Sequence, residues 1–244
     1  MKEVKILMTL KHPNINEIYG TEEEDRFIHI FLQLCTGGDL FTYVSTANMR
    51  NHRLCEAEAK YIMFQLLKAL EYLHNRHIAH RGKLTFQFGN APICLDLDDL
   101  PLQPENILLY APGPYPRVLI ADFGLARPNS YQETLNVCGT VSYLPPEGIL
   151  ALDNKHLGYV GMPADCWSAG VILYVMMSGC HPFDNGTPDS YWEESEYGSQ
   201  LEEDMREESY HKPSQMEAQA RLKTRIVQGH VEFPYYPWNS LREG

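Results

Sequence analysis

Basic clusters and long apolar runs are both lacking in this sequence. Its 20 lysines and arginines are outnumbered by 32 aspartates and glutamates, and they form no basic run. A surface that binds nucleic acid needs clustered basic side chains to replace the counterions of the phosphate backbone. The most apolar stretch, residues 167–180, is too short to cross a bilayer. We therefore expect no nucleic-acid partner and no membrane partner.

Close cysteine pairs and a signal peptide are lacking as well. The six cysteines are scattered, without the paired spacing of a zinc site or the density of a secreted disulfide scaffold. Residues 1–10 contain no apolar core of the length that a signal peptide needs. These absences favour an intracellular protein, either cytoplasmic or nuclear.

Acidic residues are concentrated in one segment. Residues 189–208 carry nine carboxylates and a single arginine, together with serine, glycine and tyrosine. This composition is typical of a solvated insertion.

The hydrophobic periodicity predicts an α+β fold in which strands come early and helices dominate later. Helices are expected where apolar residues recur at helical spacing, and strands where short apolar runs lie between turn residues. The expected helices are residues 3–10, ended by His12-Pro13, residues 56–77 and residues 164–177. The expected strands are residues 15–18, 27–32, 107–109 and 118–121, with turns at 22–25 and 111–116.

Several short motifs occur in a fixed order along the chain. Asp122-Phe123-Gly124 follows the expected hairpin, and Asn106 lies sixteen residues before Asp122. The others are His80-Arg81 and the segments LQPENILL (102–109), GTVSYLPPE (139–147) and DCWSAGV (165–171). A lone D-F-G is usually only a turn, but this order and spacing match the protein-kinase signature set. The chain therefore resembles the eukaryotic protein kinase superfamily over nearly its whole length.

The residues of three segments narrow the resemblance. Residues 139–147 resemble the substrate platform of serine/threonine kinases rather than that of tyrosine kinases, and residues 179–183 and 226–234 resemble the calmodulin-dependent and checkpoint kinase group. The resemblance implies a signalling enzyme that transfers phosphate from ATP to serine or threonine hydroxyls of protein substrates.

The resemblance also implies a bilobal fold, of which the chain holds mostly the helical C-terminal lobe. Residues 1–32 would be a remnant of the N-terminal lobe, and residues 33–244 would be the C-terminal lobe with insertions at 82–101 and about 184–222. We expect the glycine-rich loop and the strand lysine of the family to be missing, because nothing precedes Met1. We also expect the last helices to be absent after residues 237–239.

Site residues are carried over from the matching motifs. Asn106 and Asp122 would hold Mg²⁺, which needs hard oxygen ligands, and His80 and Arg81 would belong to the catalytic loop. Taken alone, Asn106 and Asp122 are also residue types that commonly begin or cap turns. Nucleotide contacts are implied at Glu3, Leu32, Gln33, Cys35, Asp39 and Leu108.

Regulation is implied by residues 127–138, which resemble an activation loop. Ser130 and Thr134 would be available to an upstream activating kinase, and Arg81 could pair with the added phosphate. Asp165 resembles the residue that anchors the catalytic-loop backbone from a buried helix. Glu147 is expected to be a buried carboxylate.

The catalytic loop departs from the family. The aspartate that accepts the substrate proton should follow His-Arg directly and stand five residues before the asparagine. Here Gly82 follows Arg81, Pro101 stands five residues before Asn106, and about twenty residues intervene. Asp99 is the nearest candidate base, two residues out of place.

Two hypotheses explain residues 82–101. Either they are a translated intron whose removal restores the aspartate, or they are real and the chain is a pseudokinase that serves as a protein-interaction scaffold. We favour the intron, because a long insertion inside a tightly specified functional loop is hard to accommodate. In either case we expect little activity from the chain as written.

Overall fold

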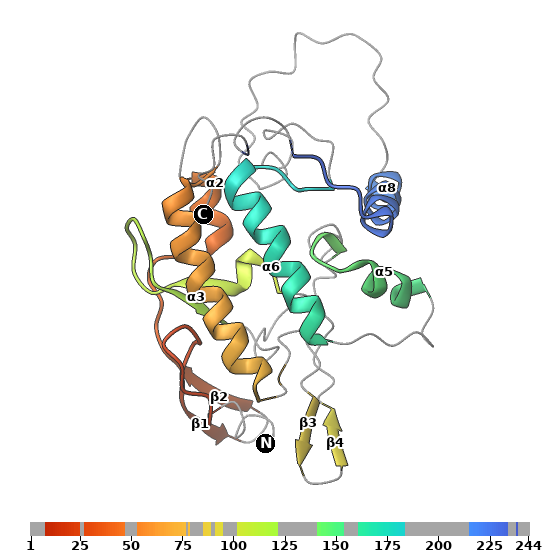
Figure 1. Cartoon of the computed structure of the whole chain (residues 1–244). Helices are drawn as coiled ribbons and strands as arrows, with labels where there is room; N and C mark the ends of the chain where they lie inside the picture. Colours follow the sequence, from red (N-terminus) through yellow and green to blue (C-terminus); the bar gives the residue numbers. More distant parts are fainter. Residues whose placement is uncertain are drawn as a thin grey trace.

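The computed structural model describes residues 8–24, 27–46, 53–76, 78, 85–88, 91–94, 102–121, 141–153, 161–183, 215–233 and 238. Within these ranges a helical body carries three separate two-stranded antiparallel sheets (Figure 1). The strands are β1 (Ile18–Glu24), β2 (Phe27–Leu32), β3 (Thr85–Phe88), β4 (Ala91–Cys94), β5 (Ile107–Leu109) and β6 (Val118–Ile120). The helices are α2 (Leu40–Thr46), α3 (Glu56–His74), the short 3-10 helix η1 (Pro104–Asn106), α5 (Pro146–Asp153), α6 (Gly161–Ser178) and α8 (Gln215–Gln228). The expected α+β class is confirmed.

Two long helices, α3 and α6, lie side by side and form the centre of the body (Figure 1). One face of α3 is fully buried because its apolar residues recur at helical spacing: Ala59, Ile62, Leu66, Leu70 and Leu73. Helix α6 is apolar on all sides, as a helix in the core should be. Both helices were expected from the sequence, although α3 ends at His74 rather than at residue 77.

The β5–β6 hairpin packs against α3 and α2. Ile107 pairs with Ile120, and Leu109 pairs with Val118. Ile107, Leu109 and all three residues of β6 are buried. The expected hairpin and its connecting turn are thus confirmed.

A buried group of amide hydrogen bonds holds this hairpin in place. The Asn14 side-chain amide donates to Gln65 Oε1 (2.9 Å) and to the Val118 carbonyl (2.8 Å). Gln65 Oε1 also accepts the Val118 N–H (3.1 Å), and Gln65 Nε2 donates to the Pro116 carbonyl (3.1 Å). Three segments that are distant in the sequence are therefore fixed to one another through satisfied polar groups.

The N-terminal segments differ from expectation in two places. Glu22, Glu23 and Glu24 belong to strand β1 rather than to a turn, because β2 supplies their ladder partners His29, Ile28 and Phe27. Residues 15–18 are not a continuous strand: Ile15 makes an isolated bridge to Ile120, and β1 begins at Ile18. Of the helix expected at 3–10, residues 3–7 lie outside the described ranges, and residues 8 and 9 form a turn.

Three helices had no counterpart in the sequence-based expectations. Helix α2 has seven residues, which is too few to display a periodic stripe, and α5 begins inside the Pro145-Pro146-Glu147 motif, at Pro146. Helix α8 begins at Gln215, inside the range 184–222 that was expected to be an insertion.

We expect Gln65→Leu to destabilise the protein by about 2–4 kcal/mol, because the buried Val118 N–H and Pro116 carbonyl would each lose a partner. The midpoint of urea unfolding measures this loss. Gln228→Leu, at the exposed end of α8, is the matched control and should shift the midpoint little. Equal midpoints for the two variants would contradict the importance assigned to the buried amides.

Candidate active site

The candidate metal position lies where the β5–β6 hairpin opens. Asn106 ends helix η1, is 7% exposed, and directly precedes β5. Its carbonyl accepts the N–H of Ala121 at 2.8 Å. The structure therefore places Asn106 and Ala121 side by side at the open end of the hairpin, and Asp122, the next residue in the sequence, lies outside the described residues.

The family resemblance implies that residues 33–35 are the hinge between the two lobes, and the segment after them runs against β5. The Gly37 N–H donates to the Leu109 carbonyl (3.0 Å), and the Leu109 N–H donates to the Gly38 carbonyl (2.9 Å). A Cβ on Gly37 would lie 2.6 Å from Leu109 Cβ, and Gly38 has a φ of +80°. Only glycines fit both conditions, which explains why this motif needs two of them in succession.

This contact brings Asp39 beside Leu108, two of the expected nucleotide contacts. The two residues form an isolated antiparallel bridge. Asp39 also caps α2: its Oδ1 accepts the Thr42 N–H (2.8 Å), and its Oδ2 accepts the Thr42 hydroxyl (2.9 Å). A contact of Asp39 with ribose or with the substrate stays a prediction, and the ligand would have to share these oxygens with Thr42.

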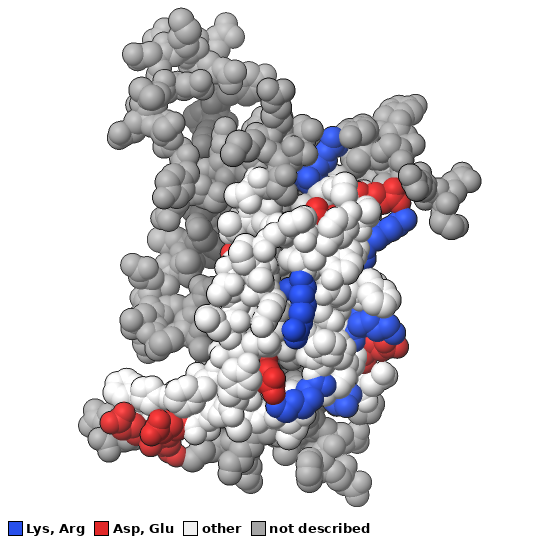
Figure 2. All heavy atoms as spheres, turned by 90° about the vertical axis from the view of Figure 1, so that its left-hand side faces the viewer, with Lys and Arg blue, Asp and Glu red and all other residues white. Residues whose placement is uncertain are grey.

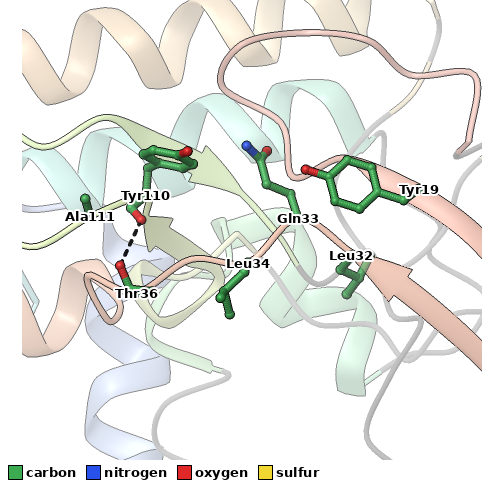
Figure 3. Close-up of a pocket in the computed structure, with 7 residues that line it drawn as sticks. All are labelled: Tyr19, Leu32, Gln33, Leu34, Thr36, Tyr110 and Ala111. Atoms are coloured by element: carbon green, nitrogen blue, oxygen red, sulfur yellow. Dashed lines mark hydrogen bonds between the residues drawn. The ribbon is translucent and has the colours of Figure 1, made fainter.

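A groove of about 410 Å³ lies beside the hinge (Figure 3). It is lined by Tyr19, Leu32, Gln33, Leu34, Thr36, Tyr110 and Ala111. Leu32 and Gln33, two of the expected nucleotide contacts, line this groove, whereas Cys35, Asp39 and Leu108 do not. Its two aromatic side chains, Tyr19 and Tyr110, are 61% and 44% exposed. The groove therefore brings together only part of the expected nucleotide set.

Asp165 lies fully buried on α6 and meets the last residue of α3. Its Oδ2 is 2.9 Å from His74 Nε2. Ile78, only four residues beyond His74, is also buried, and the chain then leaves the described residues toward His80 and Arg81. This position suits the expected role of Asp165 beside the catalytic loop.

Several expected site residues cannot be placed. Glu3, His80, Arg81, Asp99, Asp122, Ser130 and Thr134 all lie outside the described ranges. Among the side chains that the structure describes, no three of His, Cys, Asp and Glu gather closely enough to hold a metal ion. An asparagine and an aspartate are nevertheless the hard oxygen donors that Mg²⁺ prefers, so the residue types fit.

The sequence led to one wrong expectation about burial and did not reveal one pair of buried amide side chains. Glu147 is exposed rather than buried, because Gly148 and Ile149 turn inward at the start of α5 while Glu147 faces outward, as Leu150 does. The amides of Asn14 and Gln65 position strand β6 yet escaped notice, since a buried polar residue leaves no periodic signal in the sequence.

Cys35 offers a chemical test of the hinge. Burial raises the pKa of its thiol, and the positive charge of Arg117 offsets only part of that shift. We expect iodoacetamide at pH 7.5 to modify Cys35 more slowly than the exposed Cys55 and Cys166. The Cys35 thiol is partly buried, and its raised pKa keeps it protonated at that pH. Peptide mass spectrometry reads each rate separately. Equal rates at the three positions would contradict the partly buried hinge.

The sequence of this chain matches a known protein family. A model of the protein kinase domain matches residues 1–82 and 99–227. The chain is 35% identical over 185 residues to CBL-interacting serine/threonine-protein kinase 8 of Arabidopsis thaliana, covering 75% of this chain and 35% of the relative. It is 36% identical over 197 residues to the meiosis-specific serine/threonine-protein kinase MEK1 of Saccharomyces cerevisiae, with the same coverages.

A third relative belongs to the calmodulin-dependent group. The chain is 30% identical over 181 residues to calcium/calmodulin-dependent protein kinase type 1 of Macrobrachium nipponense, covering 74% of this chain and 44% of the relative. The chain thus spans between about a third and a half of the length of these relatives. Among the described residues, no helix is long and apolar enough to span a membrane. The sequence motifs, the hairpin geometry and the family match agree, and the chain belongs to the protein kinase domain family.

Proposed function

We propose that this protein is a serine/threonine kinase, which transfers the γ-phosphoryl group of ATP to hydroxyls of protein substrates. The observation that carries the proposal is the hydrogen bond between Ala121 and Asn106, because it aligns the two strands at the open end of the hairpin, from which magnesium would be held. The identity to named serine/threonine kinases supports the same reaction.

The roles of the chain's residues follow from this geometry. Mg²⁺, when bound, neutralises the charge that develops on the transferring phosphate. The amide oxygen of Asn106 and the carboxylate of Asp122 would hold it. Leu108, on the partly exposed side of β5, would support the adenine ring, and Gln33 and Cys35 would line the hinge.

The reaction also needs the aspartate that accepts the substrate proton, and this aspartate is missing from its expected place after Arg81. Ile78 and Leu102, which flank residues 79–101, are both buried in the same core. Between them, β3 and β4 pair with each other and project from the helical body (Figure 1). The family match also omits residues 83–98. These observations support an insertion at 82–101 that the core does not need.

Replacing residues 82–101 with one aspartate would satisfy both spacing rules of the catalytic loop. That aspartate would follow Arg81 and stand five residues before Asn106. We therefore favour the translated-intron explanation. The finer assignments belong to the same proposal: ATP and Mg²⁺ as cofactors, an upstream activating kinase acting at Ser130 or Thr134, and an intracellular location.

The test is transfer of radiolabelled phosphate from ATP to a basic serine-containing peptide by the protein purified from its own cells. We expect transfer that falls by about 10²–10³-fold in the Asp122→Asn variant, because one magnesium ligand loses its charge. Glu23→Gln, which removes one carboxylate from the exposed strand β1, is the matched control and should leave the rate unchanged.

The competing function is a non-catalytic scaffold, and the displaced aspartate is the observation that favours it. In that case neither the purified protein nor its Glu23→Gln control would transfer phosphate, although both are folded. Transfer that survives Asp122→Asn undiminished would instead assign the activity to a contaminating kinase.

A further inference from the structure

Helix α3 carries a second apolar stripe on its outer side. Tyr61, Phe64 and Leu67 recur every third residue and are 42%, 63% and 49% exposed, although the opposite face of the same helix is fully buried. A helix that is apolar on two faces is expected to be covered on both. Figure 2 looks onto the side of the molecule where α3 lies and shows a largely uncharged surface with a few basic and acidic side chains on it.

The stripe continues onto the turn between β5 and β6. The ring of Tyr115 meets the ring of Tyr61 edge-on at 5.7 Å. Tyr115 has a φ of +52°, which is unfavourable for a tyrosine, and its N–H donates to Glu58 Oε1 at 2.9 Å. The Tyr43 hydroxyl donates to the same oxygen. The exposed aromatic side chain is therefore held in a strained position, as expected where a surface is prepared for contact.

Two lysines bracket the centre of the stripe. Lys60 and Lys68 stand one helical turn before and after Phe64, and their side chains are 65% and 52% exposed. Each makes a local ion pair, with Glu56 and Glu71 respectively. Exposed pairs of this kind contribute little and exchange easily, so each ammonium group can also take an incoming carboxylate. The surface therefore fits a segment with aromatic anchors between carboxylates.

The chain itself contains such a segment. Residues 189–197 read DSYWEESEY, in which Tyr191 and Trp192 lie between Asp189 and Glu193-Glu194. The longer acidic stretch 189–208 accounts for eight of the twelve net negative charges. An extended chain from residue 184 to residue 197 spans up to roughly 46–50 Å, which exceeds the roughly 28 Å length of a 19-residue helix.

We propose that residues 189–197 dock on the outer face of α3 in the same molecule, with their aromatic side chains against Tyr61, Phe64, Leu67 and Tyr115. The carboxylates on either side face Lys60 and Lys68. The start of α3 is tied to the end of α6 by the bond from the Leu54 N–H to the Met176 carbonyl (2.8 Å), so the segment emerges near one end of this face. This docking is independent of whether the kinase is active.

The test is limited digestion of the full chain with a glutamate-specific protease, followed by mass spectrometry of cleavage after Glu196. We expect Phe64→Ser to raise the cleavage rate at least threefold, because the anchor for the segment is lost. Phe27→Ser, on the exposed face of β2, is the matched control and should leave the rate unchanged. Circular dichroism confirms that each variant is folded.

A charge exchange makes the test specific. Lys60→Glu combined with Lys68→Glu should also raise cleavage after Glu196, and adding Glu193→Lys with Glu194→Lys should restore protection. The proposal is overturned if Phe64→Ser, like the control Phe27→Ser, is cleaved at the same rate as the unaltered chain. It is also overturned if protection grows with protein concentration, since the segment would then bind a second copy.

Discussion

Two buried amide side chains, Asn14 and Gln65, determine where the β5–β6 hairpin lies. Together they satisfy the N–H and carbonyl of Val118 and the carbonyl of Pro116, groups that would otherwise be buried without partners. Because polar groups in a core must be paired, this arrangement allows one position of β6 relative to α3. The N-terminal segment, the long helix and the hairpin are consequently fixed together.

The candidate active site depends on that hairpin. Strand β5 carries Leu108 and begins directly after Asn106, while β6 leads through Ala121 to Asp122. The close approach of Gly37 to Leu109 then places the hinge segment against the same strand. Displacing the hairpin would therefore move Asn106, an expected metal ligand, together with Leu108, an expected nucleotide contact. The core on either side of the catalytic loop, at Ile78 and Leu102, remains packed despite the intervening residues.

Much of this arrangement could be predicted from the sequence. Apolar periodicity indicates the long helices and the hairpin strands, and the kinase motifs give the spacing of the candidate site residues along the chain. Helices α3 and α6 and the β5–β6 hairpin were found this way. Helix α2 was not, because it is short and depends on the Asp39 cap, and the turn at Glu22–Glu24 was misplaced because strand pairing overrode its acidic composition. The Asn14–Gln65 pair could not be foreseen, since the two residues lie 51 positions apart and meet only in the fold.

The central claim is that this kinase domain is interrupted within its catalytic loop by residues that do not belong to the working protein. Sequencing the messenger RNA from the Ile78 codon to the Asn106 codon tests it most directly. We predict a transcript in which an aspartate codon follows Arg81 and Leu102 comes next. A transcript that encodes residues 82–101 as printed would contradict the claim and leave a pseudokinase scaffold as the account of this chain.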